Sequence, residues 1–445
     1  MSAASDACLR LVQQRQSERR LPSISATVFR GAERLWYGAA GHAVLDPPTP
    51  PTEDTQYRLG SITKTFTAVL VMQLRDAGWL DLDDRIGDHL GDVPHGSPTI
   101  RRLLSHLSGL QREPAGEVWE TLAPPSREQL MKNVAAAELV LPPNRRWHYS
   151  NLAYALLGEL VARLTGGTWE EALHERLLDP LGLTRTTHAP VAPFAQGYFV
   201  DPYADRATPE PVLEMAGTAS AAQLWSTADD LARWGAFLVA PDPAVLADDT
   251  LAEMTHLHAM ADQEGWTLGW GLGWMLFRRD TTVLVGHTGG MPGHLAALAV
   301  SRKDGVGAAA FCNNSAVFEA GAFAVDLVTT WLENDPAPAT PWTQGPPVPP
   351  EVEGILGTWW TEGTQFVFSW REGRLQALPV GAPPAMPPAV FERDGDDAFR
   401  TVSGREQGEW LRVVRDAGGG VAKMYWATYP LTRKPLIFGA SLPYD

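Results

Sequence analysis

The sequence predicts an α/β (α+β) fold for its first part, with an antiparallel sheet flanked by helices and an all-α subdomain, followed by a small C-terminal β-barrel. Strand-like segments lie near residues 23–38 and again over 266–312, whereas the chain between them has mainly helical periodicity. Strands from both ends would then form one sheet, and the middle helices would pack on it. Seven prolines over residues 334–350 indicate a stiff linker. We therefore expect domains at residues 1–333 and 351–445.

The first segments of the chain predict a helix, a hairpin and a second helix. Residues 6–20 have the spacing of an amphipathic helix. Polar and apolar residues alternate over 23–30 and 33–38, on either side of a glycine turn, which predicts a hairpin. An apolar helical run then begins at Ser61 and ends at Gly78.

Helical periodicity recurs in the middle of the chain, and strand-like alternation returns after it. Ser226 is the expected N-cap of the last middle helix. Asp304 and Gly305 would join the last two strands of the first domain as a hairpin. The expected helices lie at 99–106, near 126–138, and at 152–164, 227–239 and 316–333, and the expected strands lie at 266–277, 281–287, 295–301 and 306–312.

Short alternating runs separated by glycine turns characterise the chain beyond the linker. The runs at 365–370, 410–414 and 421–426 predict a small β-barrel or sandwich. Arg433 lies in a basic loop of this domain and is the residue there best suited to meet a carboxylate or a peptide terminus. A solvated turn would look the same in the sequence.

The run that begins at Ser61 places Lys64 three residues later. Residues i and i+3 lie on one face of a helix, so Ser61 Oγ and Lys64 Nζ can meet without a long-range contact. A serine hydroxyl becomes an effective nucleophile when a neighbouring base takes its proton, and burial favours the neutral lysine amine that could do so. Alone, the spacing also fits a capped surface helix.

Two further segments carry side chains suited to the same chemistry. Tyr149 stands on a turn before a helical run, where its phenol can project into a cleft, although it could equally pack beneath the turn with Asn151 as a cap. The segment from His287 to Gly290 ends a strand-like run. Its glycines would let backbone N–H groups approach a substrate closely, unless they form an ordinary glycine turn.

The order Ser-x-x-Lys, Tyr-x-Asn, His-Thr-Gly resembles the serine β-lactamase and penicillin-binding-protein-like hydrolases, in particular the class C β-lactamase, D-peptidase and esterase branch. The resemblance extends over about residues 20–333, and Gly269–Trp274 and Leu224–Leu231 are also similar to that branch. It implies a β-lactamase/transpeptidase-like fold. The C-terminal domain is loosely similar to the lipocalin-like domain of some D-peptidases and acyltransferases, on the basis of Gly354–Gly357 and its strand pattern.

The resemblance also implies roles for individual residues. Ser61 would attack an acyl carbon, Lys64 and Tyr149 would share the base role, and Tyr149 would protonate the leaving group. The backbone N–H groups of Ser61 and Gly290 would bind the oxyanion. Asn151 would orient Lys64 or hold a substrate amide carbonyl.

Other residues are expected to bind the substrate. Thr288 and Gly289 belong to the same motif as Gly290. Trp119, Trp225 and Trp270 flank the motif segments and could line an apolar acyl pocket.

His287 occupies the position at which the β-lactamases that this chain resembles carry a lysine. A histidine is mostly neutral at pH 7, so it suits the free carboxylate of β-lactams or D-Ala-D-Ala ends poorly. Esters, amides or thioesters without that carboxylate fit better.

Composition limits the partners and the location. The formal net charge is −16 and no basic cluster is present, so we expect no nucleic-acid or membrane partner. No apolar run is long enough to cross a membrane. Met1–Cys8 shows no basic segment followed by an apolar one, and Cys8 and Cys312 fit free thiols, so we expect a cytoplasmic protein. No metal or other cofactor is expected.

Three functions follow as hypotheses. The leading one is a serine acyl hydrolase of small-molecule or peptide substrates, which cleaves esters, amides or D-configured peptide ends. The second is a penicillin-binding-protein-type thioesterase that releases and cyclises nonribosomal peptidyl thioesters, with an acyl-carrier or peptidyl thioester donor as partner. The third is a non-catalytic acyl-binding sensor, which the intact Ser61, Lys64 and Tyr149 disfavour. The sequence predicts no oligomeric state.

Overall fold

The computed structural model describes residues 2–91, 93–315, 318–336, 341–384 and 386–437. The chain forms two compact units, residues 1–337 and 338–445. None of the helices among the described residues combines the length and the apolar character needed to cross a membrane.

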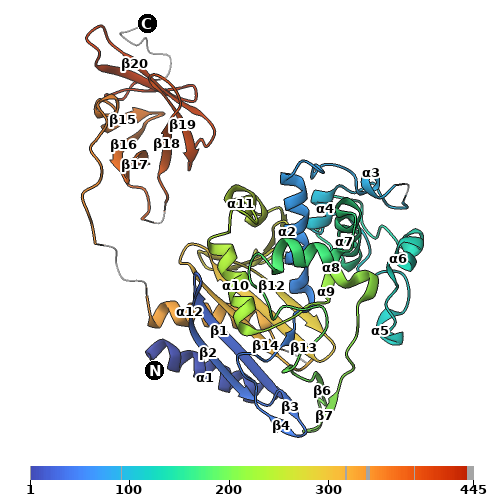
Figure 1. The fold of residues 1–445 in the computed structure, drawn as a ribbon. Helices are drawn as coiled ribbons and strands as arrows, with labels where there is room; N and C mark the ends of the chain where they lie inside the picture. Colours follow the sequence, from blue (N-terminus) through green and yellow to red (C-terminus); the bar gives the residue numbers. More distant parts are fainter. Residues whose placement is uncertain (1, 92, 316–317, 337–340, 385, 438–445) are drawn as a thin grey trace. The chain divides into compact units, whose positions relative to one another are not determined.

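The first unit is built on one eight-stranded antiparallel sheet with the order β2-β1-β14-β13-β12-β11-β10-β9 (Figure 1). It unites strands from both ends of the unit, as the sequence predicts. The strands are β1 (Ser23–Arg30), β2 (Glu33–Gly41), β9 (Ala259–Met260), β10 (Leu268–Trp270), β11 (Met275–Arg279), β12 (Thr282–Met291), β13 (His294–Ser301) and β14 (Val306–Cys312).

Helices cover both faces of this sheet. α1 (Ala3–Glu18) and α12 (Ala320–Asn334) pack on one face, where alternate residues of β1 such as Ala26 and Val28 join their apolar side chains. α10 (Ala228–Val239) packs on the other face, where Phe29 of β1 enters a separate core cluster. The alternation of side chains along a strand explains how one strand serves both layers.

The helical subdomain surrounds α2 (Thr63–Asp76), which is central and deeply buried. Eleven of its fourteen residues are buried, so α2 has almost no solvent-facing side. α7 (Asn151–Thr165) packs beside it, and Gly166 ends α7 in the left-handed conformation with φ 78°. The other helices of the first unit are α3 (Ile86–Leu90), α4 (Ile100–Leu104), α5 (Val118–Thr121), α6 (Arg127–Asn133), α8 (Trp169–Leu173), α9 (Ala219–Ala222) and α11 (Asp248–Thr255).

Three local expectations were wrong. Ser61 lies in a 3₁₀ turn, Gly60–Ile62, that leads into α2 and not in the first turn of the α-helix. The N-cap of α10 is Thr227, whose hydroxyl accepts the N–H of Asp230 at 3.2 Å, because Ser226 pairs with another strand. The strand expected over 266–277 divides into β10 and β11, because the chain turns at Gly273 with φ 86°.

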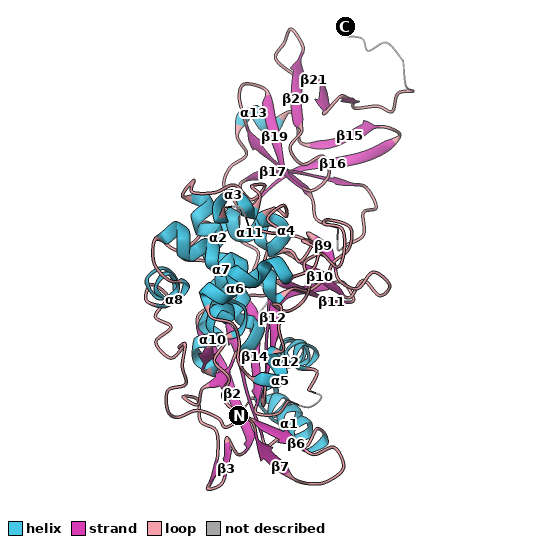
Figure 2. Cartoon of the chain, turned by 90° about the vertical axis from the view of Figure 1, so that its right-hand side faces the viewer, coloured by secondary structure: helices cyan, strands magenta, loops and turns pink. Residues whose placement is uncertain are grey.

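The second unit is an antiparallel eight-stranded sheet in sequence order that closes almost completely into a barrel (Figure 2). Trp360 in the first strand pairs with Thr432, just after the last strand. Aromatic side chains fill the interior, among them Trp359, Phe366 and Trp426. The strands are β15 (Gly357–Thr361), β16 (Thr364–Arg371), β17 (Arg374–Pro379), β18 (Ala389–Arg393), β19 (Ala398–Ser403), β20 (Trp410–Arg415), β21 (Val421–Trp426) and β22 (Tyr429–Leu431).

Candidate active site

Ser61 and Lys64 meet as their spacing predicts. Ser61 Oγ lies 3.0 Å from Lys64 Nζ. The turn that carries Ser61 requires glycine at position 60, which has φ 52°, and a Cβ there would lie 2.6 Å from the backbone nitrogen of Gly290. The serine is thus held between the start of α2 and the strand β12.

Lys64 is completely buried, and its amine has no carboxylate partner within hydrogen-bonding distance among the described residues. Its Nζ donates to the carbonyl of Ala221 at 2.8 Å. Burial lowers the pKa of Lys64 well below its usual value, and the Arg112 cation acts in the same direction, while the Glu113 carboxylate partly opposes them. The amine is therefore suited to accept a proton.

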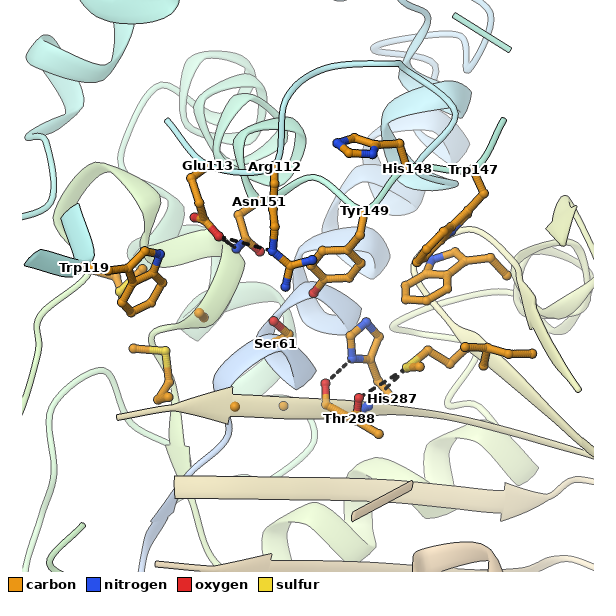
Figure 3. A pocket seen from close by; sticks show the side chains of 18 residues that line it. Ser61, Arg112, Glu113, Trp119, Trp147, His148, Tyr149, Asn151, His287 and Thr288 are labelled. Carbon is orange, nitrogen blue, oxygen red and sulfur yellow. Dashed lines mark hydrogen bonds and ion pairs between the residues drawn. The ribbon is translucent and has the colours of Figure 1, made fainter. Parts of the chain in front are cut away.

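Tyr149 lies on the turn before α7, and its hydroxyl points toward Ser61 (Figure 3). Lys64 Nζ lies 4.9 Å from the centre of the tyrosine ring. Burial raises the pKa of Tyr149, although a hydrogen bond with Ser61 partly opposes this. The phenol keeps its proton at neutral pH and is suited to donate it.

The segment from His287 to Gly290 lies inside β12, so the expectation that it ends the strand was wrong. β11 pairs with β12 only as far as Gly286, whereas β13 pairs along the whole segment. The segment therefore keeps one backbone edge free of strand pairing, next to the turn that carries Ser61. A Cβ at Gly289 would collide with the carbonyl of Leu59, so only glycine permits this approach.

His287 is neutral in this environment. Burial and the nearby Lys64 lower the pKa of His287 to about 3, although a hydrogen bond to the carbonyl of Thr288 opposes the shift. The Nδ1 of His287 lies 2.5 Å from that carbonyl, which fixes the proton on Nδ1. This supports the expectation that position 287 supplies no fixed positive charge.

A cavity of about 560 Å³ opens above Ser61. Its lining contains most of the predicted substrate-side residues and several aromatic and sulfur-containing side chains. Trp119 and Trp147 lie on opposite sides of Ser61 (Figure 3). The predicted residues in the lining are Ser61, Trp119, Tyr149, Asn151, Trp270, His287, Thr288, Gly289 and Gly290.

The structure corrects one predicted substrate contact. Trp225 is 1% exposed and does not line the cavity, because its strand β8 (Trp225–Ser226) pairs with β5 (Tyr57–Arg58) just before the Ser61 turn. Arg433 donates to the carbonyls of Gly354 at 2.7 Å and Leu356 at 3.1 Å. Its guanidinium therefore stabilises the barrel's own chain, and the contact of Arg433 with a substrate stays a prediction.

Arg112 and Glu113 are site residues that the sequence did not indicate. Both line the cavity, and the Arg112 guanidinium lies 4.8 Å from the centre of the Tyr149 ring. Asn151 Nδ2 donates to Glu113 Oε1 at 2.6 Å, and Asn151 Oδ1 is buried without a hydrogen-bond partner. Two adjacent charged residues after a glycine turn form no spacing motif, so only the folded chain reveals them.

Comparisons with known proteins agree with this geometry. A family model described as Beta-lactamase matches residues 9–328, and one described as a domain of unknown function (DUF7586) matches residues 348–433. Penicillin-binding protein 4 of Amycolatopsis lactamdurans is 29% identical over 78% of this chain and 95% of its own length. Two other relatives are matched over only about half of their length. Beta-lactamase-like protein 2 of Dictyostelium discoideum is 31% identical over 55% of this chain and 47% of its own length. Esterase EstB of Burkholderia gladioli is 34% identical over 44% of this chain and 53% of its own length.

Solved structures share the fold. The octameric penicillin-binding protein homologue from Pyrococcus abyssi aligns with a TM-score of 0.66 and 21% identity over 96% of this chain and 99% of its own. The D-stereospecific amidohydrolase from a Streptomyces species aligns with a TM-score of 0.62 and 26% identity over 75% of this chain and 99% of its own. With the family model spanning most of the first unit and a serine, a buried lysine and a tyrosine assembled at its cavity, the chain belongs to the β-lactamase and penicillin-binding-protein-like family of serine hydrolases.

Proposed function

We propose that this chain hydrolyses esters and amides, including those of D-configured substrates, through an acyl-enzyme on Ser61. One observation carries the proposal. Ser61 Oγ lies 3.0 Å from the amine of a completely buried lysine, at the floor of a cavity of about 560 Å³. This arrangement supplies both a nucleophile and an uncharged base.

Two buried side chains share the proton transfers. Burial leaves Lys64 as a neutral amine that can accept a proton, and it leaves Tyr149 as a protonated phenol that can donate one. Lys64 accepts the proton of Ser61 as Oγ attacks the acyl carbon, and the oxyanion forms near the N–H groups of Ser61 and Gly290. Tyr149 gives its proton to the leaving oxygen or nitrogen, and the proton held by Lys64 restores the phenol. A water molecule then attacks the acyl carbon, the same groups act in reverse, and Ser61 recovers its proton.

Apolar side chains on both sides of Ser61 favour substrates that are apolar on both sides of the scissile bond. Met215, Ala222 and Met291 form one apolar cluster of the lining. Trp147 and Trp270 belong to a second cluster, with ring centres 5.1 Å apart. The names of the Burkholderia esterase and the Streptomyces D-stereospecific amidohydrolase support esters and D-configured amides as the bonds that are cleaved.

Intact mass spectrometry after exposure to an activated ester, a penicillin and a D-terminal peptidyl thioester tests the proposal. We expect a transient acyl adduct and rapid turnover with the ester. Failure of all three compounds to acylate the protein would contradict the proposal. A product lighter than the linear acid by one water would instead support the cyclising thioesterase. An acyl-carrier partner and a cytoplasmic location stay predictions.

Penicillin should be turned over at least tenfold more slowly than a simple ester, on the order of the effect of one lost charge contact, because neutral His287 cannot hold the carboxylate. His287→Lys should shift the ratio of kcat/KM values toward substrates that carry a carboxylate. Arg112→Gln tests whether the arginine in the cavity lining binds the substrate carboxylate instead. Penicillin turnover equal to ester turnover in the unmodified protein would contradict the expectation. If that penicillin turnover were then lost in Arg112→Gln, Arg112 would be the group that binds the carboxylate.

The pH dependence of ester cleavage should report on Lys64. Below its lowered pKa the residue is an ammonium ion and cannot accept the serine proton, so kcat/KM should rise with pH along one limb. The midpoint should lie well below the ordinary lysine value of 10.5. Lys64→Arg should be inactive at every pH, while His287→Gln should leave the limb in place, because the pKa of His287 is about 3. Loss of the limb in His287→Gln would mean that the histidine is the titrating base.

A further inference from the structure

His106 occupies a backbone position that usually belongs to glycine. It follows the cap residue Ser105 at the end of α4 and has φ 58°. The N–H groups of His106 and Leu107 donate to the carbonyls of Leu103 at 3.3 Å and Arg102 at 2.8 Å, which completes a Schellman motif. A side chain in this left-handed conformation costs about 1 kcal/mol, and the contacts of this buried histidine can offset that cost.

His106 accepts two hydrogen bonds from the backbone on either side of Tyr149. The carbonyl of His106 accepts the N–H of His148 at 2.9 Å. Its ring Nδ1 accepts the N–H of Ser150 at 3.1 Å. The residue before Tyr149 and the residue after it are thus bound to one buried residue.

The imidazole ring also supports the tyrosine ring directly. The two ring centres lie 4.4 Å apart with an angle of 30° between the planes. Lys64 Nζ and the Arg112 guanidinium lie 4.9 Å and 4.8 Å from the centre of the tyrosine ring. The orientation of the phenol therefore depends on His106 for both its backbone and one of its ring contacts.

The tautomer of His106 follows from these contacts. Because Nδ1 accepts a backbone N–H, the ring proton must lie on Nε2, which is buried and has no hydrogen-bond partner among the described residues. Burial lowers the pKa of His106 well below its usual value, and the nearby Lys64 adds to this. The ring therefore stays neutral, and Nδ1 stays available as the acceptor.

We propose that His106 is a positioning residue that aims the Tyr149 phenol at Ser61 through these two hydrogen bonds and the ring contact. The inference rests on the proposed role of Tyr149 as proton donor. His106 itself does not line the cavity and acts only through the tyrosine. A small displacement of an acid from the reacting atoms is enough to slow a proton transfer, since 1 Å can cost about 10²-fold.

Two substitutions separate the hydrogen bond from the backbone strain. His106→Gly relieves the strain of the left-handed conformation but removes both the ring acceptor and the ring contact to Tyr149. His106→Asn tolerates that conformation, places Oδ1 where Nδ1 lies and so loses only the ring contact, which we expect to contribute less than the hydrogen bond. With an activated ester, we expect His106→Gly to lower kcat at least about tenfold with little change in KM, and His106→Asn to stay within about threefold of the unmodified protein.

A double-mutant cycle with Tyr149→Phe tests whether His106 acts through the phenol. In the Tyr149→Phe background, His106→Gly should add no further loss. Full activity of His106→Gly, or an undiminished loss in the Tyr149→Phe background, would overturn the inference. Full activity of Tyr149→Phe alone would instead overturn the proposed role of the tyrosine, so the two failures are distinguishable.

A second pair of variants serves if His106→Gly does not fold, as judged by circular dichroism. His106→Gln carries an acceptor one bond further from the backbone than His106→Asn. We expect the asparagine variant to be active and the glutamine variant to lose at least about tenfold in kcat. Equal kcat values in the two folded variants would overturn the inference.

Discussion

Ser61→Ala is expected to abolish both turnover and the covalent adduct. The hydroxyl is the nucleophile, and no second hydroxyl is described within hydrogen-bonding distance of Lys64 Nζ. A chain without its nucleophile keeps only the contribution of the oxyanion site and of substrate binding, so the rate should fall by at least about 10⁴-fold. Intact mass spectrometry with an activated ester and burst kinetics measure the two effects.

A hydroxyl in the same cavity provides the control. Thr288 lines the cavity, and Thr288→Ala should still be acylated because its hydroxyl lies near the sulfur of Met275, at 3.6 Å, and not near the lysine. If a folded Ser61→Ala variant still gained the full mass of the acyl group, the nucleophile would be another residue.

Lys64→Ala and Tyr149→Phe are each expected to lower kcat by about 10²–10⁴-fold, the usual range for a positioned acid or base. The double variant should be little worse than either single one. Lys64 Nζ and the phenol both contact Ser61, and the proton that Lys64 takes from Ser61 is needed to restore the phenol, so the two groups depend on each other. Groups that act as one unit give non-additive losses.

Single-turnover acylation of the two single variants and the double variant measures this coupling. Burial supplies the physical reason for the pairing, because it favours the neutral form of both side chains. Strictly multiplied losses in the double variant would mean that lysine and tyrosine serve separate steps.

Local patterns in the sequence were sufficient for an antiparallel sheet built from both ends of the first unit and for the first contact of the site. The hairpin of β1 and β2 follows from alternation and a glycine turn, and the Ser61–Lys64 contact follows from a spacing of three residues. The cap of α10 was misplaced by one residue because both Ser226 and Thr227 are able to cap, and strand pairing with Tyr57 decides between them. A sequence pattern does not contain that pairing.

Longer-range contacts decide the rest of the site. The open edge of β12 depends on where β11 begins, and the preceding turn at Gly273 is shaped by its close approach to Ala68 of α2. Trp225 is conspicuous in the sequence, yet the fold buries it. Arg112 lies in the segment between α4 and α5, far from α7 in the sequence. It reaches the cavity because this segment packs against the start of α7, where the carbonyl of Arg112 accepts the N–H of Asn151 at 2.6 Å.

The residues that react with the substrate and those that select it lie on different parts of the fold, because α2 is central and buried. Ser61 and Lys64 belong to one turn whose surroundings are filled on nearly every side, so few substitutions there could be accommodated. Trp119 and Arg112, in contrast, are more exposed side chains in the walls of the cavity. During divergence, such a chain can exchange its preferred substrate by remodelling peripheral loops while inheriting its reactive centre intact.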